Sequence, residues 1–238
     1  MIEIRNILDV RNHVEGLKAV VFDMDGVLFD TEKLCFDCWC QVAKEQGISD
    51  METVFPRCIG RNNTDVREIL FDFYGADFAY DTFCAEASVY FKRYITDNGM
   101  PMKPGVVELL DYLKKDGYTI GLASSTRYAS VVNHLEQAGI REYFTEIVGG
   151  DMVEHSKPEP DIYLIACEKL GADPKETYAI EDSFNGIRSA YRAGMKPVMV
   201  PDMLAPDEEM KKLSLVICKD LTELRNYFET TVNNDEER

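Results

Sequence analysis

Two aspartates follow a short apolar segment near the start of the chain. Residues 19–22 read Ala-Val-Val-Phe, and Asp23 and Asp25 come next, before Gly26. An unbroken apolar run is typical of a strand buried on both faces of a parallel sheet, whose carboxyl edge is where ligands bind. Carboxylates there can act as nucleophile, as general acid or as oxygen ligands of Mg²⁺. An ordinary acidic turn fits the same residues, so the rest of the chain must decide.

Other predicted strands also end in polar side chains. Segment 118–123 is followed by four such residues in a row, Ser124, Ser125, Thr126 and Arg127. This segment could cap a helix, bind phosphate at the helix N-terminus, or do both.

A lysine and two further acids complete the set of polar residues. Lys157 lies between Ser156 and Pro158, and segment 177–180 is followed by Glu181 and Asp182. Carboxylates gathered at one sheet edge repel one another unless a cation lies among them. Together with Asp23 and Asp25, these acids predict a metal site.

The elements that would position these residues fall into two blocks. Apolar residues recur at helical spacing from about 31 to 103. After Gly105 the pattern changes to four repeats of helix, glycine and short apolar strand, ending at 118–123, 144–148, 177–180 and 197–200. Segment 213–217 is a candidate edge strand. Such repeats indicate βα units and a parallel sheet.

The segment Asp23-Met24-Asp25-Gly26-Val27-Leu28-Phe29-Asp30-Thr31-Glu32 resembles the first motif of the haloacid dehalogenase superfamily, in its subgroup of phosphatases and β-phosphoglucomutases. Ser124, Lys157 and the Glu181-Asp182 pair resemble the three later motifs, in the expected order. The resemblance covers most of the chain after residue 17.

This resemblance implies a role for each residue. Asp23 would be the nucleophile and Asp25 the general acid and base. Ser124 and Lys157 would contact the phosphoryl group, with Ser125, Thr126 and Arg127 near the substrate. Mg²⁺ would be held by Asp23, the Asp25 carbonyl and Asp182, with Glu181 reaching it directly or through water. Dehalogenases of this superfamily lack an acid at the position of Asp25, which favours phosphoryl transfer.

The resemblance also implies an α/β fold: a Rossmann-like parallel-sheet core, residues 1–30 and 104–238, and an inserted all-helical cap, residues 31–103. Apolar spacing in 1–17 predicts an extra N-terminal helix that the resemblance does not cover. In the cap, Arg61, Asn62 and Asn63 are candidate substrate contacts, although a turn before a helix capped by Thr64 fits equally well.

Two departures separate the chain from the mutases of the subgroup. Cys35 occupies the position of a mutase histidine on the first cap helix, and Asn63 lies opposite the mutase arginine. Plain hydrolysis of a small phosphate ester is therefore the expected reaction, by a phosphoric monoester hydrolase. A phosphosugar mutase is the alternative, and a non-catalytic binding protein on the same scaffold is a more distant one.

Composition limits the partners. A net charge of −17 disfavours binding of nucleic acid or anionic membranes through a basic surface. No apolar stretch approaches the roughly 20 residues of a membrane-spanning helix, and the first 16 residues lack a signal-peptide core. We therefore expect a cytoplasmic protein with seven reduced cysteines, in which Cys35, Cys38 and Cys40 are buried thiols rather than a metal site.

Overall fold

The computed structural model describes residues 18–61 and 63–235. Six parallel strands form one sheet in the order β3-β2-β1-β4-β5-β6, with β1 near the middle. The strands are β1 Ala19–Phe22, β2 Thr119–Ser124, β3 Glu146–Gly149, β4 Thr177–Glu181, β5 Lys196–Met199 and β6 Val216–Ile217. The predicted α/β class and parallel sheet are thus confirmed.

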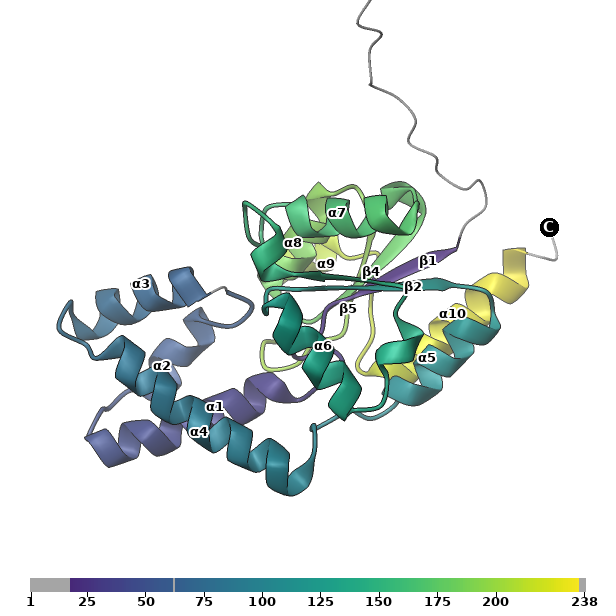
Figure 1. Ribbon diagram of the computed structural model, residues 1–238. Helices are drawn as coiled ribbons and strands as arrows, with labels where there is room; N and C mark the ends of the chain where they lie inside the picture. Colours follow the sequence, from purple (N-terminus) through teal and green to yellow (C-terminus); the bar gives the residue numbers. More distant parts are fainter. Residues whose placement is uncertain (1–17, 62, 236–238) are drawn as a thin grey trace, which may run out of the picture.

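Helices cover both faces of this sheet (Figure 1). The helices that follow or connect the strands are α5 Val106–Lys115, α6 Tyr128–Gln137, α7 Asp161–Leu170, α8 Phe184–Arg192, α9 Glu208–Leu213 and α10 Leu221–Asp235. Figure 1 places α5, α6 and α10 on one face and α7 and α8 on the other. In β1, Val20 and Phe22 pack with the first group, and Ala19 and Val21 with the second. Alternate side chains of a strand point to opposite faces, which is why all four had to be apolar.

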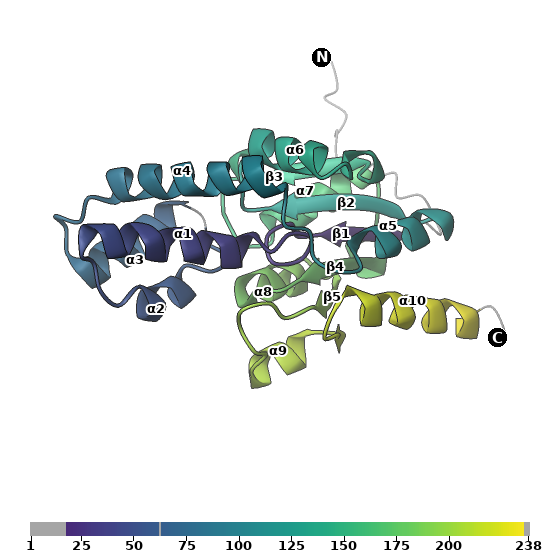
Figure 2. The ribbon, with the colours of Figure 1, turned by 90° about the horizontal axis from the view of Figure 1, so that it is seen from below.

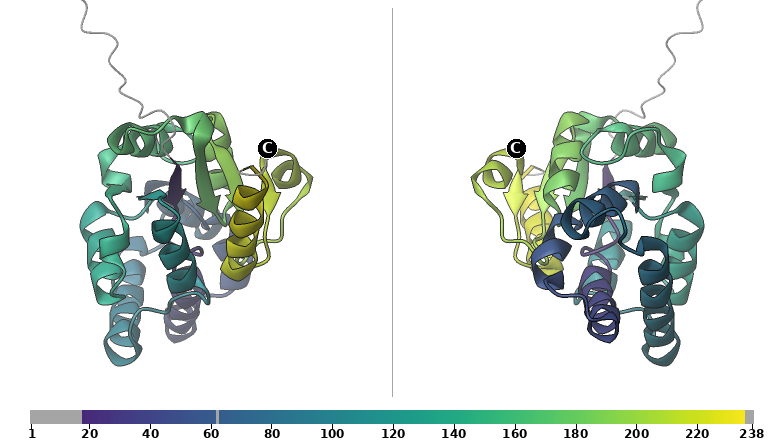
Figure 3. Two further views of the ribbon diagram at one scale, coloured as in Figure 1. Left: turned by 90° about the vertical axis from the view of Figure 1, so that its right-hand side faces the viewer. Right: turned by 90° about the vertical axis from the view of Figure 1, so that its left-hand side faces the viewer.

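A second group of helices lies beyond the end of β1 (Figures 1 and 2). These are α1 Thr31–Gln46, α2 Met51–Val54, α3 Asn63–Tyr74 and α4 Tyr80–Asn98. They enclose an apolar cluster of their own, in which Trp39 contacts the rings of Phe55 and Phe83. The right-hand view of Figure 3 looks onto these helices in front of the sheet. The first polar residues after β1 therefore lie between two separately packed bodies.

Several details differ from the expectations. Leu213 ends α9 instead of opening the last strand, which is only Val216–Ile217. Thr64 lies inside α3, which begins at Asn63, so it is not the cap of that helix. All seven cysteines are free, but Cys35 and Cys40 are only partly buried. The helix predicted within 1–17 lies outside the described residues. None of the described helices combines the length and the apolar composition required to cross a membrane.

Candidate active site

The loop after β1 begins at the point where the sheet order reverses. Asp23 continues the strand, its amide donating to the Ile180 carbonyl of β4 at 2.9 Å. Gly26 then turns the chain with φ +80°. A Cβ built on this glycine would lie 2.3 Å from Asp182 Oδ2. The glycine is thus required twice, for its backbone conformation and for the close approach of a carboxylate.

Lys157 joins the acids of two strands. Its ammonium group donates to Asp23 Oδ1 at 2.5 Å, to Glu181 Oε1 at 2.6 Å and to the Ala123 carbonyl at 3.2 Å. Burial alone lowers the pKa of Lys157, but the Asp23 and Glu181 carboxylates outweigh it and raise the pKa above its ordinary value. The lysine is therefore a permanent buried cation beside Asp23.

Protein donors surround the Glu181 carboxylate. Oε1 accepts from the Tyr163 hydroxyl at 2.7 Å as well as from Lys157. Oε2 accepts from the Asp182 and Ser183 amides and from the Ser183 hydroxyl. These donors occupy most of the acceptor sites of the carboxylate and fix Glu181 beside Lys157.

Asp23, Glu181 and Asp182 form the group of acids best suited to a cation among the described residues. Each offers one carboxylate oxygen, and these oxygens lie within 4.8 Å of one another. Burial raises the pKa of Asp23 above its ordinary value. The Lys157 charge lowers this pKa, and the Glu181 charge raises it, so the net shift is upward. Burial and the Glu181 charge also raise the pKa of Asp182. Buried, closely spaced oxygen donors that resist ionisation fit a hard divalent cation, which would let them ionise.

Hydroxyl groups hold Asp25. Thr31 donates to Oδ1 at 2.6 Å, and Thr126 donates to Oδ2 at 2.9 Å. Ser124 lies 3.4 Å from the same Oδ2, is fully buried and accepts from the Thr126 amide at 3.1 Å. Asp25 is thus fixed from both sides, by the first residue of α1 and by the loop after β2. The contact between Thr31 and Asp25 was not predicted, because the sequence indicates only that Thr31 begins a helix.

A cavity of about 1090 Å³ opens between this sheet edge and helices α1–α4. Asp23, Asp25, Lys157 and Asp182 line it, whereas Ser124 and Glu181 lie behind the lining. The predicted substrate contacts that line it are Ser125, Thr126, Arg127, Arg61 and Asn63. Asn62 lies outside the described residues.

The sequence interpretation missed other residues of the cavity wall. Glu32, on the first turn of α1, lines the cavity. His134 also lines it, with Arg127 and Ser130. Ser130 and His134 lie four residues apart on α6 and therefore on one helix face, and this spacing could have revealed His134.

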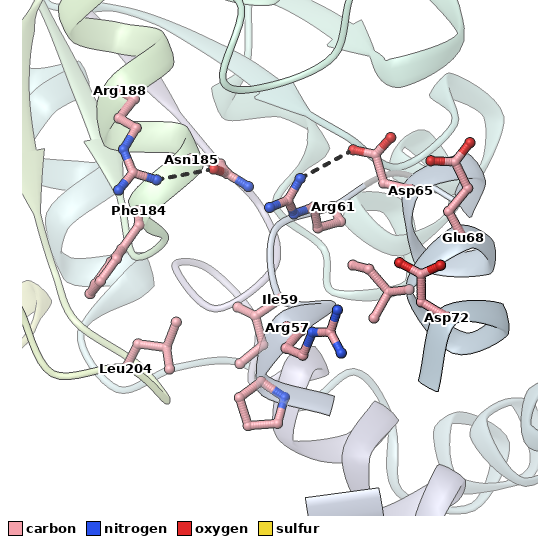
Figure 4. Close-up of a pocket in the computed structure, with 12 residues that line it drawn as sticks. Arg57, Ile59, Arg61, Asp65, Glu68, Asp72, Phe184, Asn185, Arg188 and Leu204 are labelled. Carbon is pink, nitrogen blue, oxygen red and sulfur yellow. Dashed lines mark hydrogen bonds and ion pairs between the residues drawn. The ribbon is translucent and has the colours of Figure 1, made fainter. Parts of the chain in front are cut away.

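A second, smaller hollow of about 460 Å³ is lined by residues of α3 and α8 (Figure 4). Arg61 lines both spaces and faces Asp65 at 3.7 Å. From α8, Arg188 contributes a guanidinium group 3.3 Å from the Asn185 side-chain oxygen. Basic and acidic side chains balance here, and the lining includes neither Asp23, Asp25 and Lys157 nor Asp182.

The sequence was next compared with known proteins. A family model described as haloacid dehalogenase-like hydrolase matches residues 20–200. The chain belongs to this family. The phosphorylated carbohydrates phosphatase of Thermotoga maritima is 32% identical over 182 residues, which are 76% of this chain and 84% of that protein. The β-phosphoglucomutase of Bacillus subtilis is 34% identical over 192 residues, covering 77% and 83% of the two chains.

Solved structures agree on the fold. The β-phosphoglucomutase of Clostridium difficile superposes with a TM-score of 0.75 at 24% sequence identity. The superposition covers 93% of this chain and 100% of that chain. The chain is therefore a haloacid dehalogenase-like phosphoric monoester hydrolase of the β-phosphoglucomutase-like subgroup, as its motifs predict.

Proposed function

We propose that the chain is a Mg²⁺-dependent phosphatase that hydrolyses a phosphorylated sugar or related small metabolite through an aspartyl-phosphate intermediate. One observation carries the proposal. Asp23 contacts the buried cation Lys157, while Asp25, two residues later, is held by hydroxyl groups at the cavity wall. The phosphatase relative that acts on phosphorylated carbohydrates supports a sugar phosphate as substrate.

In the first half-reaction an Asp23 carboxylate oxygen attacks phosphorus. The bond from phosphorus to the alcohol oxygen breaks, and Asp25 gives its proton to that oxygen. Thr31 and Thr126 fix the carboxyl that makes this transfer. Lys157 stabilises the negative charge on the transferring group, because its raised pKa keeps it protonated. Ser124 and the residues after it are assigned to the phosphoryl oxygens and the alcohol.

In the second half-reaction water attacks the phosphorus of the intermediate. Asp25 takes the proton of the water, the bond from phosphorus to Asp23 breaks, and phosphate leaves with the Asp23 carboxylate restored. We assign the metal to Asp23, Asp182 and the Asp25 carbonyl, and we assign Glu181 to the orientation of Lys157. Bound Mg²⁺ would neutralise the phosphoryl oxygens during both transfers.

We further assign residues 31–103 to a cap that closes the site and reads the alcohol, and residues 1–30 and 104–238 to the core. Helices α1–α4 and their own apolar cluster support this division. Expelling water from a closed site strengthens the electrostatic contacts within it.

Phosphate release from a panel of sugar phosphates, nucleotides and small phospho-acids tests the proposal. We expect release with Mg²⁺, none with chelator, and none from the Asp23→Asn variant. Asp25→Asn should cut the rate while leaving Mg²⁺ affinity nearly intact, because only its carbonyl contacts the metal. A collapse of Mg²⁺ affinity in that variant would overturn this division of roles.

The β-phosphoglucomutase relative makes a phosphosugar mutase the second candidate. Cys35 weighs against it, since a thiol cannot supply the hydrogen bond of an imidazole. If no panel member releases phosphate, isomerisation of glucose 1-phosphate with a bisphosphate activator is the decisive assay.

A further inference from the structure

His134 is a polar residue of the cavity wall to which none of the four motifs gives a role. It lies on α6, is half-buried and faces the same cavity as Asp25 and Lys157. Its Nδ1 atom is shielded from solvent and has no hydrogen-bond partner in the described part of the chain.

The surroundings of His134 place it at the junction between the core and helices α1–α4. Its ring lies 6.2 Å from the ring of Phe91 on α4, centroid to centroid and at 35°. Ser130 lines the cavity from the same face of α6. The imidazole thus belongs to the wall of the same cavity that Asp23 lines.

Electrostatics decide what such a ring can recognise. Burial lowers the pKa of His134 below its ordinary value of about 6.5, and the nearby Asp25 charge opposes this effect without cancelling it. The ring is therefore neutral at neutral pH. A neutral imidazole has one N–H donor and one acceptor nitrogen, which suits a hydroxyl group and gives no charge attraction to a second phosphate. Because Nδ1 is shielded, Nε2 is the nitrogen open to a ligand.

We propose that His134 is a specificity-determining residue that hydrogen-bonds a hydroxyl group of the substrate alcohol, so that an ester makes this contact only when its alcohol carries further hydroxyl groups. The inference rests on the phosphatase function proposed above and assigns recognition of the alcohol to a named residue.

The test compares esters that differ in their hydroxyl groups. Three of the esters carry several hydroxyl groups: sorbitol 6-phosphate, glucose 6-phosphate and ribose 5-phosphate. The fourth, n-hexyl phosphate, has six carbons like the first two but no free hydroxyl group on its chain. We expect His134→Phe, which keeps a flat ring against Phe91, to lower kcat/KM for the best polyhydroxy substrate about tenfold or more, the loss expected when a site loses a hydrogen bond to a substrate hydroxyl. Its kcat/KM for hexyl phosphate should stay within about twofold of wild type.

Two further variants separate recognition from folding. His134→Gln keeps a hydrogen-bonding group and should recover part of the lost selectivity. Asn133→Ala, at an exposed position of the same helix, should leave kcat/KM unchanged for both the polyhydroxy esters and hexyl phosphate. If His134→Phe lowered kcat/KM equally for hexyl phosphate and for the polyhydroxy esters, the inference would be overturned. It would also be overturned if the variant lowered kcat/KM for neither. A wild-type enzyme that prefers hexyl phosphate would overturn it too. Absence of phosphate release from every ester would instead overturn the proposed function itself.

Discussion

Lys157 and Glu181 form a fully buried ion pair of 2.6 Å, and the same ammonium group contacts Asp23 at 2.5 Å. One cation thus serves two carboxylates that come from different strands. Glu181 cannot turn away, because Tyr163 and Ser183 hold its oxygens. Lys157 is thereby aimed at the position where Asp23 would carry a phosphoryl group.

Replacing Lys157 with Met should cost both stability and activity. The substitution leaves Asp23 and Glu181 buried without their cation, a change that typically costs about 3–5 kcal/mol of unfolding free energy. Urea unfolding in chelator at pH 7 measures this cost. Turnover should fall to the level of Asp23→Asn, since the negative charge on the phosphoryl group loses its partner.

The matched control is Tyr163→Phe, which removes one hydrogen bond to Glu181 and leaves the ion pair. It should cost about 1 kcal/mol and retain most of the activity. If Lys157→Met lost no more stability than Tyr163→Phe, the lysine would not be the counter-charge of the buried acids.

Replacing Gly26 with Ala should displace an acid that we assign to the metal. The new Cβ would lie 2.3 Å from Asp182 Oδ2, so the carboxylate must move. We expect Mg²⁺-dependent activity to fall at least about a hundredfold, because displacing a catalytic group by about 1 Å costs this much. Titration of activity with Mg²⁺ should show a raised metal requirement.

Gly117→Ala is a control with the same backbone cost. Gly117 has the same φ of +80°, and its Cβ would have nothing within 4 Å. Both variants should therefore lose about 1–2 kcal/mol from left-handed backbone strain, but only Gly26→Ala should lose activity. Equal activity in the two variants would contradict the assignment of Asp182 to the metal.

The sheet and its polar edge were predictable because both depend on local pattern. An apolar run such as Ala19–Phe22 is typical of a strand covered on both faces. Carboxyl ends of parallel strands meet at one edge, so Asp23 and Asp182 could be placed together before any coordinates were known. Strand order and the exact length of the last strand depend on tertiary packing, and there the predictions were incomplete or wrong.

Side-chain partners brought in by helices could not be predicted. The sequence shows Glu181 at a strand end but not that the Tyr163 hydroxyl reaches it from α7. Thr31 looks like the first residue of a helix until its hydroxyl is found 2.6 Å from Asp25. Such contacts depend on rotamers and on helix placement, which residue spacing along the chain does not encode.

Replacing Glu32 with Gln should stabilise the metal-free protein in a pH-dependent way. Burial, reinforced by the Asp25 charge, raises the pKa of Glu32 to about 8. From the unfolded value of about 4.3 up to that pKa, the unfolded chain ionises while the folded protein keeps the proton. Wild-type stability therefore falls as pH rises through this window, and Gln removes the effect. The advantage of the variant should grow from pH 5 to pH 8 and then level off.

Urea unfolding at several pH values, with chelator present, measures this advantage. Glu45→Gln on the same helix is a control of opposite sign. Hydrogen bonds from Tyr90 and Gln41 lower the pKa of Glu45, so its contribution is present above the unfolded pKa and is lost only as pH falls below it. Its variant should be less stable than wild type by a constant amount from pH 5 to pH 8. A constant difference for Glu32→Gln over the same range would contradict the raised pKa.

Lys103 is expected to fix the position of helices α1–α4. The segments entering and leaving them are joined by backbone hydrogen bonds, from the Asp30 amide to the Pro101 carbonyl at 2.7 Å and from the Lys103 amide to the Leu28 carbonyl at 2.9 Å. The Lys103 ammonium group contacts Asp202 and lies 3.3 Å from Asp30. The residues after Asp202 pack against the apolar cluster of α1–α4. One lysine thus ties both connecting segments to the core.

Replacing Lys103 with Met should therefore raise KM several-fold, because the cap helices lose their fixed position over the site. It should also cost about 1–3 kcal/mol of unfolding free energy, since Asp202, with a side chain only 10% exposed, is left without its cation. Asp202→Leu in the same background should recover part of this loss, because no unpaired carboxylate then remains. Lys92→Met, at an exposed position of α4, should change neither quantity. If the double variant were as unstable as the sum of the single ones, the two residues would not be coupled and the position of the cap would have to be fixed elsewhere.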